Sequence, residues 1–193
     1  MLKNPADRTS PSPASEHVDP RIQRTREHVL RVTRVLLEER KGPLTLSALA
    51  DRAKVTRQTL YTHWGTIDNV VADTIVLARP RNRSDYEALD SRSRAELFLN
   101  ELIDTLDPAM SGAIASIIGA LQYDEAAGNS FGKVDDDLFA EFISVVGPIT
   151  HDQFVELTGP IVISIISGGT VSRELVLSLA ERAAQFLNQA PRS

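Results

Sequence analysis

Apolar and polar positions follow a helical period after Pro20. The apolar side chains recur at intervals of three, four or seven residues, with arginine and glutamate between them. This spacing gathers them on one face of an amphipathic helix over residues 22–40. Gly42 and Pro43 come next, and these two residue types commonly end a helix. The positions that define the apolar face are Ile22, Val29, Val32, Leu36 and Leu37.

Three short helices are expected next, each preceded by a threonine. Thr45, Thr56 and Thr66 are suitable N-caps, because a threonine hydroxyl accepts a hydrogen bond from a backbone N–H of the first helical turn. Gly65 separates the second of these helices from the third. The expected helices cover residues 46–52, 57–64 and 67–77.

Beyond residue 91 the pattern stays helical, and no segment shows the period of two that is typical of a strand. Two capping boxes mark helix starts, namely Ser93 with Glu96 and Thr150 with Gln153. The expected helices cover residues 93–106, 108–127, 135–146, 151–167 and 172–188, with Asp107 and Pro108 starting the second and Gly128 and Asn129 ending it. The sequence therefore predicts an all-α protein of about nine helices, with a polar junction at residues 79–91.

Residues 45–64 have the pattern of a helix-turn-helix. Four apolar positions are those that such a unit buries, and the small one lets its two helices cross closely: Leu49, Ala50, Val55 and Leu60. The outward positions of the second helix are Arg57, Gln58, Tyr61 and Thr62. Arginine and glutamine suit bidentate contacts with guanine and adenine edges in the major groove. A plain helical hairpin with solvated charges would show the same pattern and remains the alternative.

Charge is divided unevenly along a chain whose formal net charge is −5. Residues 1–65 contain 12 lysine and arginine side chains against 7 acidic ones, whereas residues 66–193 contain 9 against 19. A basic N-terminal part on an acidic remainder is expected when one end of a protein meets nucleic acid. The net negative charge is therefore no objection to a DNA-binding function.

Composition excludes several other kinds of site. Cysteine is absent, which rules out disulfides, a thiolate nucleophile and cysteine-ligated zinc. The four histidines lie in separate segments, and no glycine-rich phosphate loop or nucleophile elbow occurs. No enzyme activity, cofactor or metal is predicted. The N-terminus has no apolar run, and no apolar stretch approaches membrane-spanning length, so we expect a cytoplasmic protein without membrane contacts.

The segment LSALADRAKVTRQTLYTHWGTIDNVV resembles the signature of TetR-family transcriptional regulators. The match includes Leu60-Tyr61-Thr62-His63-Trp64 followed by Thr66, and it covers about residues 22–77. The resemblance implies a homodimeric repressor that binds a palindromic, double-stranded DNA operator and is released by a small-molecule effector. It also implies a DNA contact surface made of Thr45, Lys54, Thr56, Arg57, Gln58, Thr59, Tyr61, His63 and Thr66.

Two residues depart from the family pattern. Lys54 lies in the turn where the family usually has glycine, and a positive φ angle there would cost about 1 kcal/mol. Ile67 stands where a lysine often follows the cap of the fourth helix, which leaves backbone N–H groups for that phosphate contact. Trp64 replaces the usual phenylalanine and is interpreted as core packing.

The prolines and serines of residues 1–20 indicate a disordered tail. The resemblance implies a DNA-binding domain (residues 21–78) and an effector-binding and dimerisation domain (residues 79–193). Ordinary core packing is the alternative for every residue of the last domain that we assign a function. The expected effector pocket is lined by Phe98, Leu102, Ile117, Leu121, Tyr123, Phe139 and Phe142. The expected dimer interface is formed by Phe154, Leu157, Ile161, Ile165, Leu175, Leu179, Ala183 and Phe186.

A second functional hypothesis follows from the two departures at Lys54 and Ile67. The chain would then be a helical small-molecule-binding or interaction protein whose DNA-binding part is degenerate. A third is an activator, or a general DNA-binding protein, that responds to no ligand.

Overall fold

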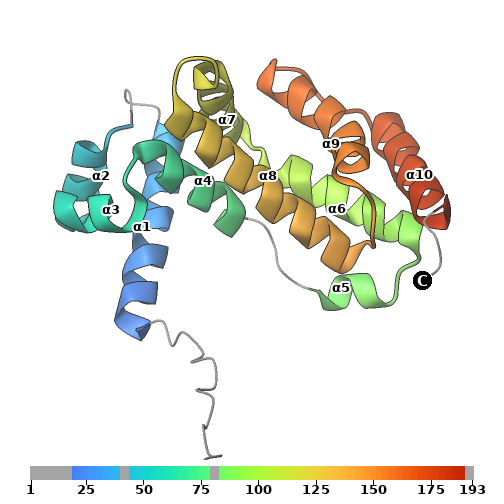
Figure 1. Cartoon of the computed structure of the whole chain (residues 1–193), viewed down its shortest axis with the longest axis horizontal. Helices are drawn as coiled ribbons and strands as arrows, with labels where there is room; N and C mark the ends of the chain where they lie inside the picture. The colour runs from blue at the N-terminus through green and yellow to red at the C-terminus, as the bar shows by residue number, and fades with distance from the viewer. Residues whose placement is uncertain (1–18, 40–43, 79–82, 190–193) are drawn as a thin grey trace, which may run out of the picture.

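The computed structural model describes residues 19–39, 44–78 and 83–189, and this part of the chain is helical throughout, with no strand (Figure 1). The expected all-α architecture is confirmed. The predicted disordered tail, apart from its last two residues, and the predicted helix end at Gly42 and Pro43 lie outside the described residues. The helices are α1 (Pro20–Glu39), α2 (Leu46–Ala53), α3 (Arg57–Trp64), α4 (Ile67–Ala78), α5 (Ser84–Glu87), α6 (Ser91–Thr105), α7 (Pro108–Ala120), α8 (Glu125–Val145), α9 (His151–Ile166) and α10 (Arg173–Gln189).

Helices α1 to α4 form one end of the molecule, which we call the head (residues 20–78). Leu49, Ala50 and Leu60 are buried in its core, and Val55 packs against it, as the helix-turn-helix pattern predicts. The predicted caps Thr45 and Thr56 also form, each accepting a backbone N–H bond at the start of its helix. The buried residues of this head cluster are Val29, Leu30, Leu49, Ala50, Ala53, Leu60, Trp64 and Val70.

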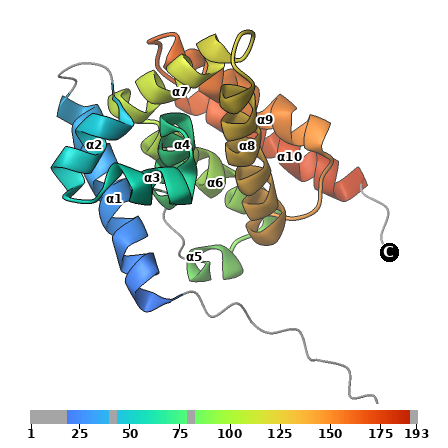
Figure 2. The ribbon, with the colours of Figure 1, turned by 60° about the vertical axis from the view of Figure 1, so that its left-hand side comes forward.

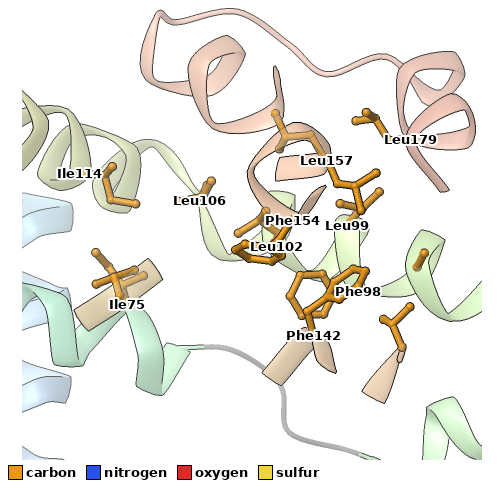
Figure 3. Packing of buried hydrophobic residues seen from close by; sticks show 14 of the residues in the cluster. Ile75, Phe98, Leu99, Leu102, Leu106, Ile114, Phe142, Phe154, Leu157 and Leu179 are labelled. Atoms are coloured by element: carbon orange, nitrogen blue, oxygen red, sulfur yellow. The ribbon is translucent and has the colours of Figure 1, made fainter. Parts of the chain in front are cut away.

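Helices α5 to α10 form the rest of the molecule, which we call the body (residues 84–189). Three phenylalanines from three helices meet at its centre (Figure 3). The ring centroids of Phe98 and Phe142 lie 5.0 Å apart, and those of Phe142 and Phe154 lie 5.7 Å apart, both edge to face. All three side chains are almost completely buried. Such aromatic pairs add to the stabilisation that the buried area already provides.

Helix α4 contributes to both hydrophobic cores. Val70 belongs to the head cluster, whereas Val71, Ala72 and Ile75 belong to the larger cluster of the body. Figure 2 shows α4 between α1 and α8, and it packs against both of them. The head is therefore joined to the body by a shared helix.

The prediction of a helix over residues 108–127 is wrong. Helix α7 ends at Ala120, and α8 begins at Glu125 after Asp124, whose carboxylate accepts a hydrogen bond from the backbone N–H of Ala126. Helix α8 then continues through Gly128 and Asn129, and the expected helix at 135–146 is its second half. A glycine inside a helix costs about 1 kcal/mol relative to alanine, which burial of the apolar face of α8 outweighs.

The junction at residues 79–91 also differs from the expectation. It contains the short helix α5, which raises the number of helices above the nine predicted. Helix α6 begins earlier than the capping-box pattern indicated, because Asp90 is its N-cap and accepts a hydrogen bond from the backbone N–H of Ser93. The second predicted capping box, Thr150 with Gln153, is present at the start of α9.

Candidate nucleic-acid interface

Helix α3 exposes one polar face and buries the opposite one. Leu60 and Trp64 lie in the head cluster, and the exposed side chains are Arg57, Gln58, Tyr61, Thr62 and His63. Tyr61 keeps 56% of its surface accessible, although a tyrosine ring of this size is often buried. These side chains supply hydrogen-bond donors and acceptors of the types that read base edges and bind phosphate oxygens.

The threonines predicted at the DNA have a structural role as helix caps. The hydroxyls of Thr45, Thr56 and Thr66 accept hydrogen bonds from backbone N–H groups at 3.1 Å, 3.0 Å and 3.2 Å, respectively. The Thr59 side chain is half-buried, and its hydroxyl lies 2.8 Å from that of Thr56. These four side chains therefore fix the ends of the helices, and the remaining free N–H groups of each first turn are open to an anion.

A shallow groove of about 430 Å³ lies where the first turns of α2 and α4 approach α3. Its wall includes Thr45, the N-cap of α2, and Ser47 in the first turn of that helix, Arg57 and Tyr61 from α3, and Thr66 at the start of α4. Two helix N-termini, each with a partial positive charge, thus border the same groove as an arginine and a tyrosine. This combination suits the phosphate backbone beside a base-reading helix.

Lys54 in the turn adopts a left-handed conformation, with φ 56° and ψ 38°, and is the one non-glycine residue of the described chain with positive φ. Its backbone N–H donates to the carbonyl of Ala50, which ends α2. The Nε2–H of His28 on α1 donates to the carbonyl of Ala53 at 3.1 Å and anchors the same turn. The expected strain at Lys54 is therefore present, and its side chain is exposed.

Lys54→Gly is expected to raise the free energy of unfolding by about 0.5–1 kcal/mol, because glycine adopts this conformation without the Cβ clash. Lys54→Ala is the matched control, since it removes the charge and keeps the strain. Urea unfolding of the three proteins measures the difference. Equal stability of the glycine and alanine variants would contradict the strain.

Trp64, at the end of α3, is held by a buried carboxylate. Its indole Nε1–H donates to Asp73 of α4 at 2.8 Å, and Arg26 of α1 and Lys133 of α8 form ion pairs with the same carboxylate. Asp73 is 5% exposed. Burial pushes the pKa of Asp73 upward, but the hydrogen bonds from Lys133 and Trp64 and the nearby positive charges hold it below its ordinary value. The carboxylate therefore stays ionised at neutral pH.

A second set of hydrogen bonds also connects the end of α3 to α8. Asn69 of α4 donates from Nδ2 to the backbone carbonyl of Trp64 at 2.7 Å, and its Oδ1 accepts a hydrogen bond from the Ser130 hydroxyl of α8 at 2.8 Å. The last residue of α3 is thus connected to α8 through both its side chain and its backbone. From the sequence, Trp64 is expected only to pack in the core. The signal that was missed is Asp73, an isolated acid among apolar residues of α4.

The residues expected to line an effector pocket have different environments. Phe98, Leu102, Ile117 and Phe142 are buried in the core, and Phe139 packs against it. Leu121 is 38% exposed and Tyr123 is 86% exposed. The structure does not bring these last two together with the others, because α7 ends before them in a tight turn.

The residues expected at a dimer interface face the interior of this chain. Phe154, Leu157, Ile161, Leu179, Ala183 and Phe186 are buried, and Ile165 and Leu175 pack partly buried against the same core. The helical spacing of these positions marks the inner face of α9 and α10. The large hydrophobic side chains of α9 that remain exposed are Val155 and Ile163.

Two further observations concern the described residues as a whole. No helix among them has the length and apolar composition needed to cross a membrane. Within the same ranges, no three histidine, aspartate or glutamate side chains are grouped so that they could hold a metal ion.

The fold matches that of solved transcriptional regulators. A TetR transcriptional regulator from a Rhodococcus species is 19% identical, with a TM-score of 0.65 over 87% of this chain and 98% of that chain. A TetR transcription regulator from Haloarcula marismortui is 18% identical, with a TM-score of 0.53 over 86% of this chain and 97% of that one. No family model and no curated protein matches the sequence. The chain therefore has the fold of the TetR transcriptional regulators.

Proposed function

We propose that the protein is a DNA-binding transcriptional regulator, a repressor that binds a palindromic operator as a homodimer and is released by a small molecule. The observation that carries this proposal is the exposed face of α3, with Arg57, Gln58 and Tyr61 directed away from a helix that is buried on its other side. A base-reading helix must be rigid as well as polar. The bonds from Trp64 to Asp73 and from Asn69 to the Trp64 carbonyl supply that rigidity at the end of α3.

The distribution of charge along the chain supports DNA as the binding partner. The basic side chains are concentrated in residues 1–65, whereas the remainder of the chain is strongly acidic. A polyanion is attracted to the first part and repelled by the second, so the electrostatic field orients the head toward DNA.

Arg57→Ala is expected to weaken binding to the operator by about 1–3 kcal/mol and to relax base preference, because a bidentate base contact carries discrimination of that size. Binding is measured by fluorescence anisotropy on the promoter next to the protein's own gene, and on a scrambled fragment. Arg92→Ala in the body is the matched control, since it also removes one positive charge and breaks an exposed ion pair with Glu181. Absence of binding to any promoter fragment at low salt would refute the proposed function.

The dimer that we propose uses the outer face of α9. Val155, Gly159 and Ile163 recur every four residues along it, with Val155 and Ile163 47% and 59% exposed. A Cβ atom added at Gly159 would meet nothing within 4 Å, which leaves room for a close approach of a second helix. A second copy is the occupant that a palindromic operator calls for, because two-fold symmetry places two heads on two half-sites.

Ile163→Glu is expected to convert the dimer to monomer in sedimentation experiments, because a buried carboxylate without a partner is strongly unfavourable at an apolar interface. Ile22→Glu, at an exposed apolar position of α1, is the control and leaves the assembly unchanged. A dimer that persists in Ile163→Glu would exclude this face.

The second candidate, a small-molecule-binding protein with a degenerate DNA-binding part, is favoured by the strained Lys54 and by Ile67 at the start of α4. It predicts thermal stabilisation by a ligand with no promoter binding. The anisotropy experiment with Arg57→Ala distinguishes the two functions.

A further inference from the structure

A cleft of about 700 Å³ lies between the head and helix α7 of the body. Its head side includes Leu36 and Leu37 of α1 and Ile67 and Val71 of α4, and residues of α7 line the opposite side. The volume is within the range of small-molecule sites, about 300–1,000 Å³, and most of the lining side chains are apolar.

Small residues of α7 keep this cleft open. Ala109, Gly112, Ala113 and Ser116 form its floor. A Cβ atom added at Gly112 would meet nothing within 4 Å, so the space above this residue is empty of protein atoms. A larger side chain at position 112 would therefore enter the cleft without displacing the backbone.

Among the described residues that line the cleft, Asp68 is the one with a charged side chain. It is half-buried in the first turn of α4, and it forms no hydrogen bond or ion pair with another described residue. Burial and the neighbouring carboxylate of Asp124 raise its pKa. Desolvation and like-charge repulsion both disfavour the ionised form, and a bound cation would relieve both.

We propose that this cleft binds an organic cation with a compact apolar body, whose charged end meets Asp68 while the body contacts the small residues of α7. A ligand in this cleft touches the head and the body at once, and we therefore identify it as the effector. This identification is the one step that rests on the proposed function. Binding alters the orientation of the head relative to α7 and lowers the affinity for DNA, because a ligand shifts an equilibrium toward the arrangement that it binds better.

The location differs from the effector pocket that the sequence suggested. Phe98 and Phe142 fill the centre of the body with edge-to-face contacts, whereas the cleft lies at the junction of the two hydrophobic clusters. Ile117 is common to both, since it was expected in the pocket and also borders the cleft. The charge and shape of the cleft, and not the aromatic core, therefore decide the ligand class.

Calorimetry with two probes of equal shape tests the proposal on the full chain without DNA. Adamantylammonium is expected to bind at least about tenfold more tightly than adamantane carboxylate, because one favourable charge contact of about 1.4 kcal/mol corresponds to that factor. Asp68→Asn removes the preference between the probes. Gly112→Leu is expected to fill the cleft and to abolish binding of both probes. Gly119→Leu is the matched control, because Gly119 is also exposed and lies on the same side of α7, and this variant is expected to bind the probes as the native chain does.

Equal affinity for the two probes, no binding of the cation, or unchanged binding in Gly112→Leu would overturn the cation site. The effector step has a separate readout, since adamantylammonium is expected to weaken operator binding of the native chain and of Gly119→Leu, but not of Gly112→Leu. Operator affinity that does not change in the presence of bound cation would overturn that step. Failure of the ligand-free chain to bind any promoter would instead refute the proposed function, and calorimetry would still decide the cation site.

Discussion

Phe142→Ala is expected to lower the free energy of unfolding by about 3–5 kcal/mol. The side chain is completely buried, and its ring packs edge to face on Phe98 and Phe154. Truncation removes those contacts and leaves a cavity that its close-packed neighbours fill only in part. Chemical denaturation with a helix signal from circular dichroism measures the loss.

This variant also decides between the two interpretations of Phe142, effector contact and core residue. Tyr123→Ala is the matched control, because Tyr123 was assigned to the same pocket and is 86% exposed. It is expected to change stability by less than about 0.5 kcal/mol. If Phe142→Ala were equally harmless, the ring would line a preformed pocket and the core interpretation would be wrong.

Asp73→Asn is expected to lower the free energy of unfolding by about 2–4 kcal/mol, because it removes a buried charge from three partners. Arg26, Lys133 and the Trp64 indole are all donors. An asparagine side chain offers them one acceptor oxygen and turns two donor hydrogens toward the others. Trp64 is the one tryptophan of the chain, so its fluorescence is expected to shift to longer wavelength as the indole loses its partner.

The pH dependence of this effect follows from the lowered pKa of Asp73. The folded-state pKa lies below the ordinary carboxylate value of about 3.9. The stabilisation is therefore fully present above that ordinary value and is lost as the pH falls through the folded-state pKa. The stability difference between the native chain and Asp73→Asn should shrink in that acid range. Asp136→Asn, on an exposed position of α8, should show no such difference at any pH.

Local sequence signals were sufficient to predict the helices of the head. Threonine caps, a helix-stopping glycine and four apolar positions at helix-turn-helix spacing specify α2 and α3 almost residue by residue, because each signal acts within one or two helical turns. The positive φ of Lys54 was anticipated from the family resemblance, in which glycine usually occupies this position of the turn.

The body was less predictable because its decisive interactions are distant in sequence. Gly128 and Asn129 would end an isolated helix, but α8 passes through them while Ala127, Ser130 and Val134 are buried against other elements. Helical spacing identifies the apolar stripes of α9 and α10, but periodicity alone does not show whether a stripe packs on its own core or on a second copy. The ion pairs of Asp73 join residues that only the tertiary fold brings together.

The sharing of α4 between the two hydrophobic clusters limits how this protein can be divided or recombined. Val70 completes the core of the head, and Val71, only one residue further, belongs to the core of the body. No cut along α4 leaves both cores intact, so the head is not a portable module. A chimera that joins this head to the body of another regulator would also have to include the face of α8 with Ser130 and Lys133, because these residues contact Asn69 and Asp73 of α4.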